Sequence, residues 1–363
     1  MENNPINQIT AEIETNSGAD HIGMLKLRTA NKAIRDAALR PDPEDLYNGL
    51  WYEGEVCCLF ADSNVGKSIF AVQMADEIAQ TRNVLYVDCE LSDKQFQLRY
   101  TNKDTGVLHA FPESLIRAEI NPAKMDMKNF EDLDADSLDL FQIINDIESA
   151  AQKTASKTIM IDNLTYLCNS SEKGDQAGIF MMKLMNLKMK YGWSLLIIAH
   201  TPKRHLTNPI TQNDLAGSKK LYNFFDSVFA IGKSARDERL RYVKQVKVRA
   251  GEFMYGGDNV IVYEIEHEGD NVRFAFKEFA KESDHLKENT EHEKQSLLEQ
   301  AQALKAEGKT VREIALALGM SKSSVDRMLK SVPVVPPVPR GTNGTSGTKG
   351  TRDKEVINEQ PLF

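Results

Sequence analysis

A lysine and a serine at the start of an expected helix are the residues best placed to do chemistry. Residues 56–60 are an apolar run, and a short polar loop follows them before Lys67 and Ser68. The chain then continues with apolar residues at helical spacing. A loop between a strand and a helix turns its backbone N–H groups inward, and the helix N-terminus adds partial positive charge. Such a loop can bind a polyphosphate.

The spacing matches the phosphate-binding pattern G-x-x-x-x-G-K-[ST] except at its first position. Lys67 would reach the β- and γ-phosphates of ATP, and the hydroxyl of Ser68 would ligate Mg²⁺. The alanine at the first position keeps the loop small but gives up easy access to positive φ. The alternative is a chance Gly-Lys-Ser at a helix start. The expected nucleotide-binding residues are Ala61, Asp62, Ser63, Asn64, Val65, Gly66, Lys67, Ser68 and Ile69.

Three further polar residues follow apolar runs that predict strands. The runs are residues 83–89, 158–161 and 194–199, and the residues that follow them are Glu90, Asp162 and His200. The carboxyl ends of parallel strands face the same ligand crevice, so these side chains are expected near the phosphates. Asp162 fits the Walker B pattern, in which the carboxylate holds Mg²⁺ directly or through water. The alternative is an aspartate that only caps the next turn.

The roles of the other two residues have equally strong alternatives. Glu90 could orient or deprotonate the water that attacks the γ-phosphate. It could instead be a surface residue that caps the helix expected from Ser92 onward. His200 could sense the γ-phosphate and pass the signal to the loop that follows it, or it could be a structural histidine at a strand end.

The elements that must position these residues alternate between strand and helix. Helices are expected at residues 138–151 and 179–191, and the alternation continues to a strand at 227–231. Three antiparallel runs follow, at residues 240–248, 260–266 and 272–276. The pattern predicts an α/β fold, in which helices flank a mostly parallel sheet with antiparallel edge strands.

Composition limits the class of protein. The 363 residues suffice for one large or two modest domains with a sizeable core. A net charge of −8 argues against coating of nucleic acid over the whole surface, although a local basic face is compatible with it. The four cysteines lack C-x-x-C spacing, which favours buried reduced thiols. Without a signal pattern or an apolar run of membrane-spanning length, we expect a cytoplasmic protein with no membrane partner.

A second, smaller module is expected near the C-terminus. After a helix at residues 294–307, Ala315, Gly319 and Val325 stand at the spacing of a helix-turn-helix, where the small residue lets two helices approach and the glycine takes the turn. The alternative is a helical hairpin that contacts protein. In the helix-turn-helix interpretation, the residues facing DNA are Lys322, Ser323 and Arg327.

A basic and amphipathic helix is expected at residues 23–39. Its charged face could contact DNA or an acidic neighbour, or simply face solvent.

These patterns divide the chain into six segments. The expected segments are a disordered start at 1–22, an N-terminal helix (23–39) and linker at 23–44, an ATPase domain at 45–280, a linker at 281–293, the helix-turn-helix module at 294–331 and a disordered Pro- and Gly/Thr-rich tail at 332–363.

Together, the phosphate loop, Glu90, Asp162 and His200 resemble the ATPase core of RecA-fold proteins. The resemblance is strongest to the AAA_25-type branch that contains RepA-type plasmid helicases and DnaB-type replicative helicases, and it covers residues 45–265. In that branch the glutamate after the second strand is the catalytic base, which implies that role for Glu90. Lys247 and Arg249 match a K-x-R-x-G pattern whose two cations reach into the ATP site of the neighbouring subunit.

The resemblance also implies partners. It implies a homo-oligomer, usually a hexameric ring, with single-stranded DNA bound by the loops that follow Asp162 and His200. Lys203 and Arg204 in the second of these loops are candidate DNA contacts. Two features depart from the pattern of replicative helicases: Ala61 in the phosphate loop and the fused helix-turn-helix.

The leading hypothesis is a Mg²⁺-dependent ATPase that acts on DNA in the replication or mobilisation of a plasmid or mobile element. One alternative is an ATP-dependent oligomeric regulator that binds DNA without unwinding it. Another is an ATPase that remodels a protein partner and uses the terminal module as an adaptor.

Overall fold

The computed structural model describes residues 20–120, 135–163, 174–201, 206–215, 219–249, 251–287 and 291–330. Its contacts divide the chain into two units, residues 1–290 and 291–363, and each is described by itself. The segments expected to be disordered, 1–22 and 332–363, lie outside the described residues, except that a short strand begins at Asp20. Within the described residues, no helix has both the length and the apolar character needed to cross a membrane.

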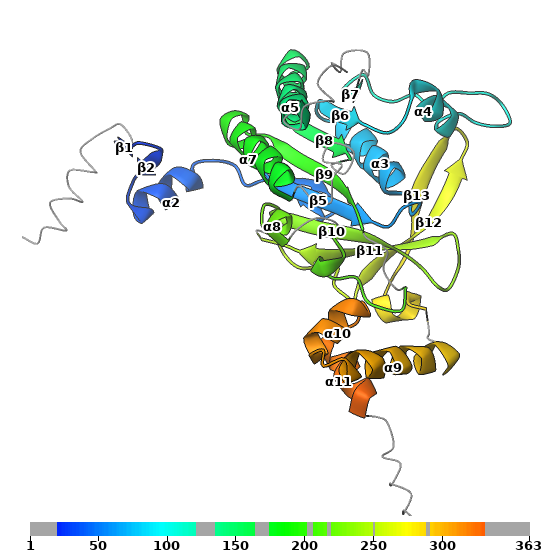
Figure 1. Ribbon diagram of the computed structural model, residues 1–363. Coiled ribbons are helices and arrows are strands. Elements are labelled where there is room, and N and C mark those ends of the chain that lie inside the picture. Colours follow the sequence, from blue (N-terminus) through cyan, green and yellow to red (C-terminus); the bar gives the residue numbers. More distant parts are fainter. Residues whose placement is uncertain are drawn as a thin grey trace, which may run out of the picture. The chain divides into compact units, whose positions relative to one another are not determined.

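A nine-stranded sheet organises the first unit, in the order β13-β12-β11-β10-β5-β9-β8-β6-β7 (Figure 1). The strands from β10 to β7 in this order are parallel to one another, and β11, β12 and β13 continue the sheet antiparallel. This confirms the α/β class and the mostly parallel sheet expected of a RecA-like core. The strands are β5 (Val56–Ala61), β6 (Val84–Asp88), β7 (Leu115–Glu119), β8 (Thr158–Asp162), β9 (Ser194–His200), β10 (Ser227–Lys233), β11 (Leu240–Lys247), β12 (Val260–Glu268) and β13 (Asn271–Ala280).

Helices cover both faces of this sheet. The central strands are buried on both faces and therefore appear in the sequence as continuous apolar runs. Phe70 and Met74 pack on one face, and Ile147, Phe180 and Leu184 pack on the other. The first pair belongs to α3 (Lys67–Ala79), and the second set belongs to α5 (Ala135–Lys153) and α7 (Gly174–Tyr191); α4 (Asp93–Arg99) and α8 (Lys219–Tyr222) are shorter.

The N-terminal segment differs from the expected helix at residues 23–39. Residues 20–27 form a hairpin of β1 (Asp20–Ile22) and β2 (Leu25–Leu27), because Gly23 takes the turn with φ of 59°. The helix α2 (Ala30–Ala38) begins only after Thr29, whose side chain accepts a hydrogen bond from the N–H of Lys32. None of its residues is buried.

Several short elements were not anticipated. They are the pair β3 (Asp45–Tyr47) and β4 (Trp51–Tyr52), the edge strand β7, and the 3₁₀ turns η3 (Gln212–Asp214) and η4 (Glu282–His285). The last falls within the expected linker at 281–293, but Glu282 and His285 are buried. Glu282 accepts a hydrogen bond of 2.7 Å from the N–H of Ile210 and pairs with Lys244, so this part of the segment packs into the first unit.

The second unit contains three described helices, α9 (Glu291–Ala306), α10 (Val311–Ala317) and α11 (Lys322–Lys330). Gly319 takes the turn between α10 and α11 with φ of 61°, and Ser321 accepts a hydrogen bond from the N–H of Ser324 at the start of α11. The core of this unit is formed by Ala301, Ile314, Ala315, Leu318 and Val325.

Candidate active site

The phosphate loop joins β5 to α3 at the carboxyl edge of the sheet. Asn64 and Gly66 adopt positive φ, at 60° and 105°, and these are residue types that tolerate this region. Ala61, by contrast, ends β5 as a buried strand residue and pairs with His200 and Ile231. The alanine therefore stands where the backbone does not need a glycine.

Lys67 lies inside the loop, with only 6% of its surface exposed. Its Nζ atom donates to the carbonyl oxygens of Ala61 at 3.1 Å and Asp62 at 2.9 Å, and it lies 3.0 Å from Nδ1 of His200. Burial lowers the pKa of Lys67, while the nearby carboxylates, first Asp162, oppose this change. The ammonium group thus stands in the loop where the sequence pattern requires it.

Asp162 ends β8 and is buried. The hydroxyl of Tyr86 donates to its Oδ2 at 2.7 Å, and Oδ1 has no hydrogen-bond partner among the described residues. Burial raises the pKa of Asp162, whereas the side chains of Ser68 and Tyr86 act to lower it. A buried carboxylate oxygen without a partner, next to a serine of the phosphate loop, fits the oxygen ligands that Mg²⁺ prefers. Ser68 and Asp162 could therefore hold the metal.

Glu90 lies beyond the end of β6 and faces His200 and Asn163. The amide of Asn163 donates to Oε1 of Glu90, and Nε2 of His200 lies 3.5 Å from the same oxygen. The hydrogen bond from His200 lowers the pKa of Glu90, although burial opposes it. The carboxylate is therefore ionised at neutral pH, and with 39% of its side chain exposed it remains accessible to water.

The structure thus brings together four residues that the sequence pattern indicated, one from the phosphate loop and three from the ends of β6, β8 and β9. These residues are Lys67, Glu90, Asp162 and His200, and they form a connected polar cluster.

Two members of the cluster were missed in the sequence. Asn163 is buried, follows Asp162 through a cis peptide bond, and lies 3.0 Å from Nε2 of His200 through its Nδ2. Tyr86 is paired with Met160 on the neighbouring strand, so that its side chain lies on the same face of the sheet as that of Asp162. The alternation of β6 and β8 could have indicated Tyr86, but only the fold reveals which strands are neighbours.

Lys247 and Arg249 lie away from this cluster. Val243 is paired with Ile231 at the level of the phosphate loop, and β11 runs antiparallel from there to the opposite edge of the sheet. Lys247 is four residues further along, about 13 Å at the usual rise of a strand. Its ammonium donates to the carbonyl of Tyr222 at 3.0 Å, and Arg249 pairs with Asp226 at 3.0 Å.

The remaining candidates do not belong to the cluster. Lys203 and Arg204 lie outside the described residues. In the second unit, Lys322, Ser323 and Arg327 are exposed on α11.

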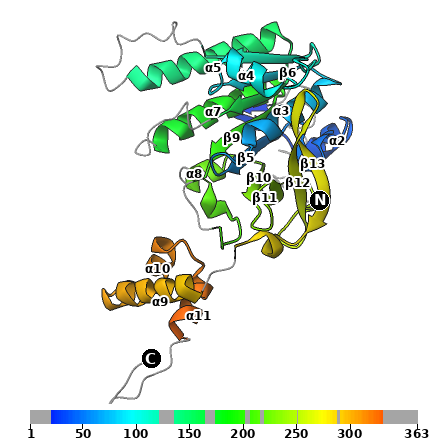
Figure 2. The ribbon, with the colours of Figure 1, turned by 90° about the vertical axis from the view of Figure 1, so that its right-hand side faces the viewer.

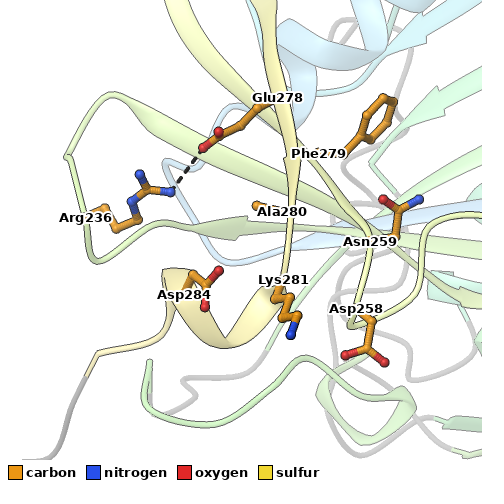
Figure 3. A pocket seen from close by; sticks show the side chains of 8 residues that line it. All are labelled: Arg236, Asp258, Asn259, Glu278, Phe279, Ala280, Lys281 and Asp284. Carbon is orange, nitrogen blue, oxygen red and sulfur yellow. Dashed lines mark hydrogen bonds and ion pairs between the residues drawn. The ribbon is translucent and has the colours of Figure 1, made fainter.

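The β12–β13 hairpin (Figure 2) borders a separate hollow of about 510 Å³, and Figure 3 draws the side chains that line it. Arg236 and Glu278 form an ion pair of 3.1 Å there. Among the described residues, none of those in the polar cluster lines this hollow, so the hollow is not part of the proposed phosphate site. Its lining residues are Arg236, Asp258, Asn259, Glu278, Phe279, Ala280, Lys281 and Asp284.

Comparison with known proteins agrees with the geometry of the loop. Residues 25–205 match the AAA_25 family, described as an AAA domain. This match supports a P-loop ATPase over that part of the chain. Among solved structures, the chain is similar to a KaiC-like protein, PH0186, from the hyperthermophilic archaeon Pyrococcus horikoshii OT3, with 13% identity, 62% of this chain and 90% of that chain covered, and a TM-score of 0.44. No curated protein matches the chain.

Proposed function

We propose that the protein is an ATP-hydrolysing, DNA-associated motor of the RepA-like helicase type that serves the replication or mobilisation of a plasmid or mobile element. The observation that carries the ATPase part is the convergence of Lys67, Glu90 and Asp162 at the carboxyl edge of one sheet. This edge is where a parallel sheet binds its ligand. The AAA_25 match over residues 25–205 supports the same class.

The residues divide the work of phosphoryl transfer. Lys67 and the loop amides bind the phosphates, while Ser68 and Asp162 hold Mg²⁺, which neutralises phosphate charge when bound. Glu90 accepts a proton from the attacking water, and its low pKa keeps it ready to do so at neutral pH. His200 lies between Lys67 and Glu90 and can therefore respond to the presence of the γ-phosphate.

The position of Lys247 and Arg249 supports the proposed homo-oligomer, for which a hexameric ring is the expected form. Since they stand at the sheet edge opposite the chain's own phosphate loop, they can serve a nucleotide only on a neighbouring copy. We expect that mixing two inactive full-length variants, Lys67→Ala and Lys247→Ala/Arg249→Ala, restores part of the activity. Either variant alone is the control, and a mixture no more active than its parts would contradict action across an interface.

The DNA-binding part is tested by steady-state ATP hydrolysis with and without single-stranded DNA over a range of protein concentrations. We expect stimulation by DNA that rises cooperatively with concentration, followed by strand displacement on a forked duplex. A slow rate that is indifferent to DNA would contradict the motor and favour the oligomeric regulator.

The exposed basic face of α11 supports duplex binding by the second unit. In the full chain, Lys322→Ala/Arg327→Ala should weaken duplex binding and lower its salt dependence, because fewer phosphate contacts release fewer counterions. It should leave the basal ATPase rate unchanged. Unchanged duplex binding would instead favour a protein adaptor.

A further inference from the structure

One buried carboxylate, that of Asp88, binds the backbone of the loop that carries Glu90. Oδ1 of Asp88, the last residue of β6, accepts hydrogen bonds from the N–H of Glu90 at 3.1 Å and of Leu91 at 2.9 Å. These bonds fix the backbone of Glu90 and of the residue after it. Asp88 is itself only 2% exposed, so its charge needs a partner.

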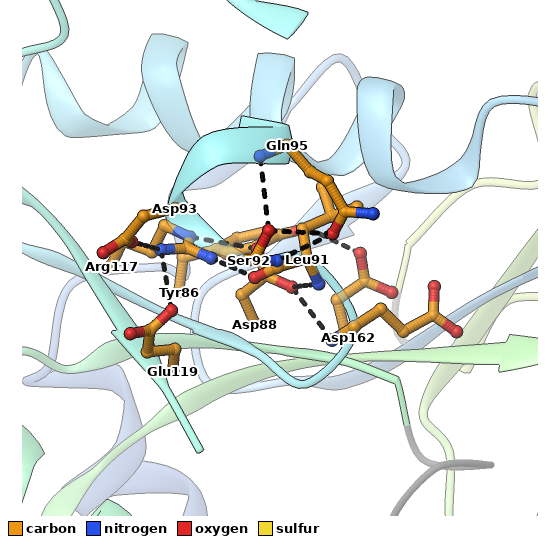
Figure 4. A network of polar contacts seen from close by, with 10 residues as sticks. Tyr86, Asp88, Leu91, Ser92, Asp93, Gln95, Arg117, Glu119 and Asp162 are labelled. Carbon is orange, nitrogen blue, oxygen red and sulfur yellow. Dashed lines mark hydrogen bonds and ion pairs between the residues drawn. The ribbon is translucent and has the colours of Figure 1, made fainter. Parts of the chain in front are cut away.

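Arg117 on the edge strand β7 provides that partner (Figure 4). Its Nε donates to Oδ2 of Asp88 at 3.0 Å, its Nη2 donates to the carbonyl of Leu91, and its Nη1 donates to Asp93 at 2.6 Å. Three different nitrogens of one guanidinium thus bond to the residue two before Glu90, the residue after it, and the first residue of α4.

The surroundings of Arg117 restrict its own position. Its side chain is 17% exposed, and the guanidinium carbon lies 4.9 Å from the centre of the ring of Phe96 in α4. Glu119, two residues along β7, adds a contact of 3.4 Å. The guanidinium group is planar and its N–H donors point in fixed directions. Because Arg117 is confined, it also restrains the groups to which it donates hydrogen bonds.

We propose that Arg117 is a positioning residue for ATP hydrolysis, which holds the Glu90 loop through Asp88 and Leu91. Arg117 makes no described contact with the side chains of the polar cluster. It acts only through the backbone of the loop that carries Glu90. This inference rests on the proposed role of Glu90 as the base. A carboxylate displaced by about 1 Å from the attacking water can cost on the order of a hundredfold in rate.

The test is a comparison of kcat, KM and the Kd for fluorescent ADP in full-length variants. Arg117→Ala should lower kcat by about tenfold to a hundredfold, with KM and Kd within about twofold of the wild type. Arg82→Ala is the matched control, since Arg82 also pairs with two carboxylates, Glu44 and Glu53, outside the cluster. It should retain the wild-type kcat. Arg117→Ala with wild-type kcat, or with kcat and nucleotide affinity lost in parallel, would overturn the inference.

Arg117→Lys covers the case in which the alanine variant does not fold. Lysine keeps the charge but offers a single nitrogen, so it cannot bond Asp88, Leu91 and Asp93 from separate donors. We expect a several-fold loss of kcat with an unfolding temperature near that of the wild type, and an unchanged kcat would overturn the three-way contact. Glu90→Gln distinguishes a failure of the proposed base from a failure of the positioning role. If Glu90→Gln hydrolyses ATP normally, the proposed base is wrong; if it is inactive while both Arg117 variants are fully active, only the positioning role is wrong.

Discussion

Nζ of Lys67 lies 3.0 Å from Nδ1 of His200, and Nε2 of the same ring lies 3.5 Å from Oε1 of Glu90. An ammonium group only donates, so Nδ1 of His200 accepts the hydrogen bond from Lys67. The bonds to His200, Ala61 and Asp62 use all three protons of Lys67. A phosphate that takes one of them must therefore weaken an existing bond.

This contact makes the charge state of Glu90 depend on His200. The hydrogen bond from His200 lowers the pKa of Glu90, so its removal in His200→Ala should raise that pKa. We expect the acid limb of kcat/KM, which reports the free enzyme, to move to higher pH in His200→Ala. His109→Ala serves as a control, because His109 pairs with Asp76 and Asp270 instead. An acid limb at the wild-type position would contradict the assignment.

Gly66 is confined by its backbone and by its neighbours. A Cβ atom there would lie 3.0 Å from Cε2 of Phe274 and 3.2 Å from Cδ1 of Ile265, and φ is 105°. Gly66→Ala should lower the free energy of unfolding by about 1–3 kcal/mol and weaken nucleotide binding. Urea unfolding and nucleotide titration measure both effects. Gly178→Ala, where a Cβ meets nothing within 4 Å in a helix, should be neutral or slightly stabilising.

Oδ1 of Asp162 is a buried carboxylate oxygen that a metal can satisfy. In the presence of ADP, Mg²⁺ should raise the unfolding temperature of the wild type by several degrees, because a ligand of the native state stabilises it. Asp162→Asn should abolish this dependence on Mg²⁺. The exposed Asp146→Asn should respond as the wild type does. An equal response to Mg²⁺ in Asp162→Asn would exclude Asp162 as a ligand.

Asp226 links stability to pH at the other edge of the sheet. Burial alone would raise its pKa, but hydrogen bonds from Lys188 at 2.8 Å and from the N–H of Val56 at 3.0 Å lower it, and Arg249 adds to them. A folded pKa below the unfolded one stabilises the fold above the unfolded pKa, and this contribution is lost as pH falls through the folded pKa.

The wild type should therefore exceed Asp226→Asn by about 1 kcal/mol in free energy of unfolding at pH 7. The difference should shrink below about pH 4. Urea titrations at several pH values measure it, and Asp42→Asn, a change at an exposed aspartate, should show little difference at any of them. A difference in free energy of unfolding that grows as the pH falls would contradict the predicted sign.

The sequence predicted the parts of the site that end apolar runs. Glu90, Asp162 and His200 each follow an apolar run that is buried on both faces, which predicts their position at strand ends. Lys67 was predicted by the phosphate-loop pattern at the start of a helix. Asn163 could not be predicted, because an asparagine that follows a strand carries no signal of burial in the sequence.

Arg117 illustrates what could not be predicted. β7 is an edge strand in which all residues but Glu119 are half-buried, so its pattern in the sequence is weak. The importance of Arg117 comes from the register that pairs it with Tyr86, two residues before Asp88, and register between distant segments is fixed only in the folded sheet. The hairpin at residues 20–27 was missed for a local reason, the turn at Gly23.

The most direct measurement for the whole account is ATP hydrolysis by Glu90→Gln, with nucleotide affinity measured on the same preparation. We predict a loss of at least about a hundredfold in kcat, the usual minimum for a lost general base, with an unchanged Kd for ATP. Glu113→Gln, an exposed glutamate on the segment before β7, should hydrolyse ATP at the wild-type rate. Wild-type hydrolysis by Glu90→Gln would contradict the central claim that Glu90 activates the attacking water.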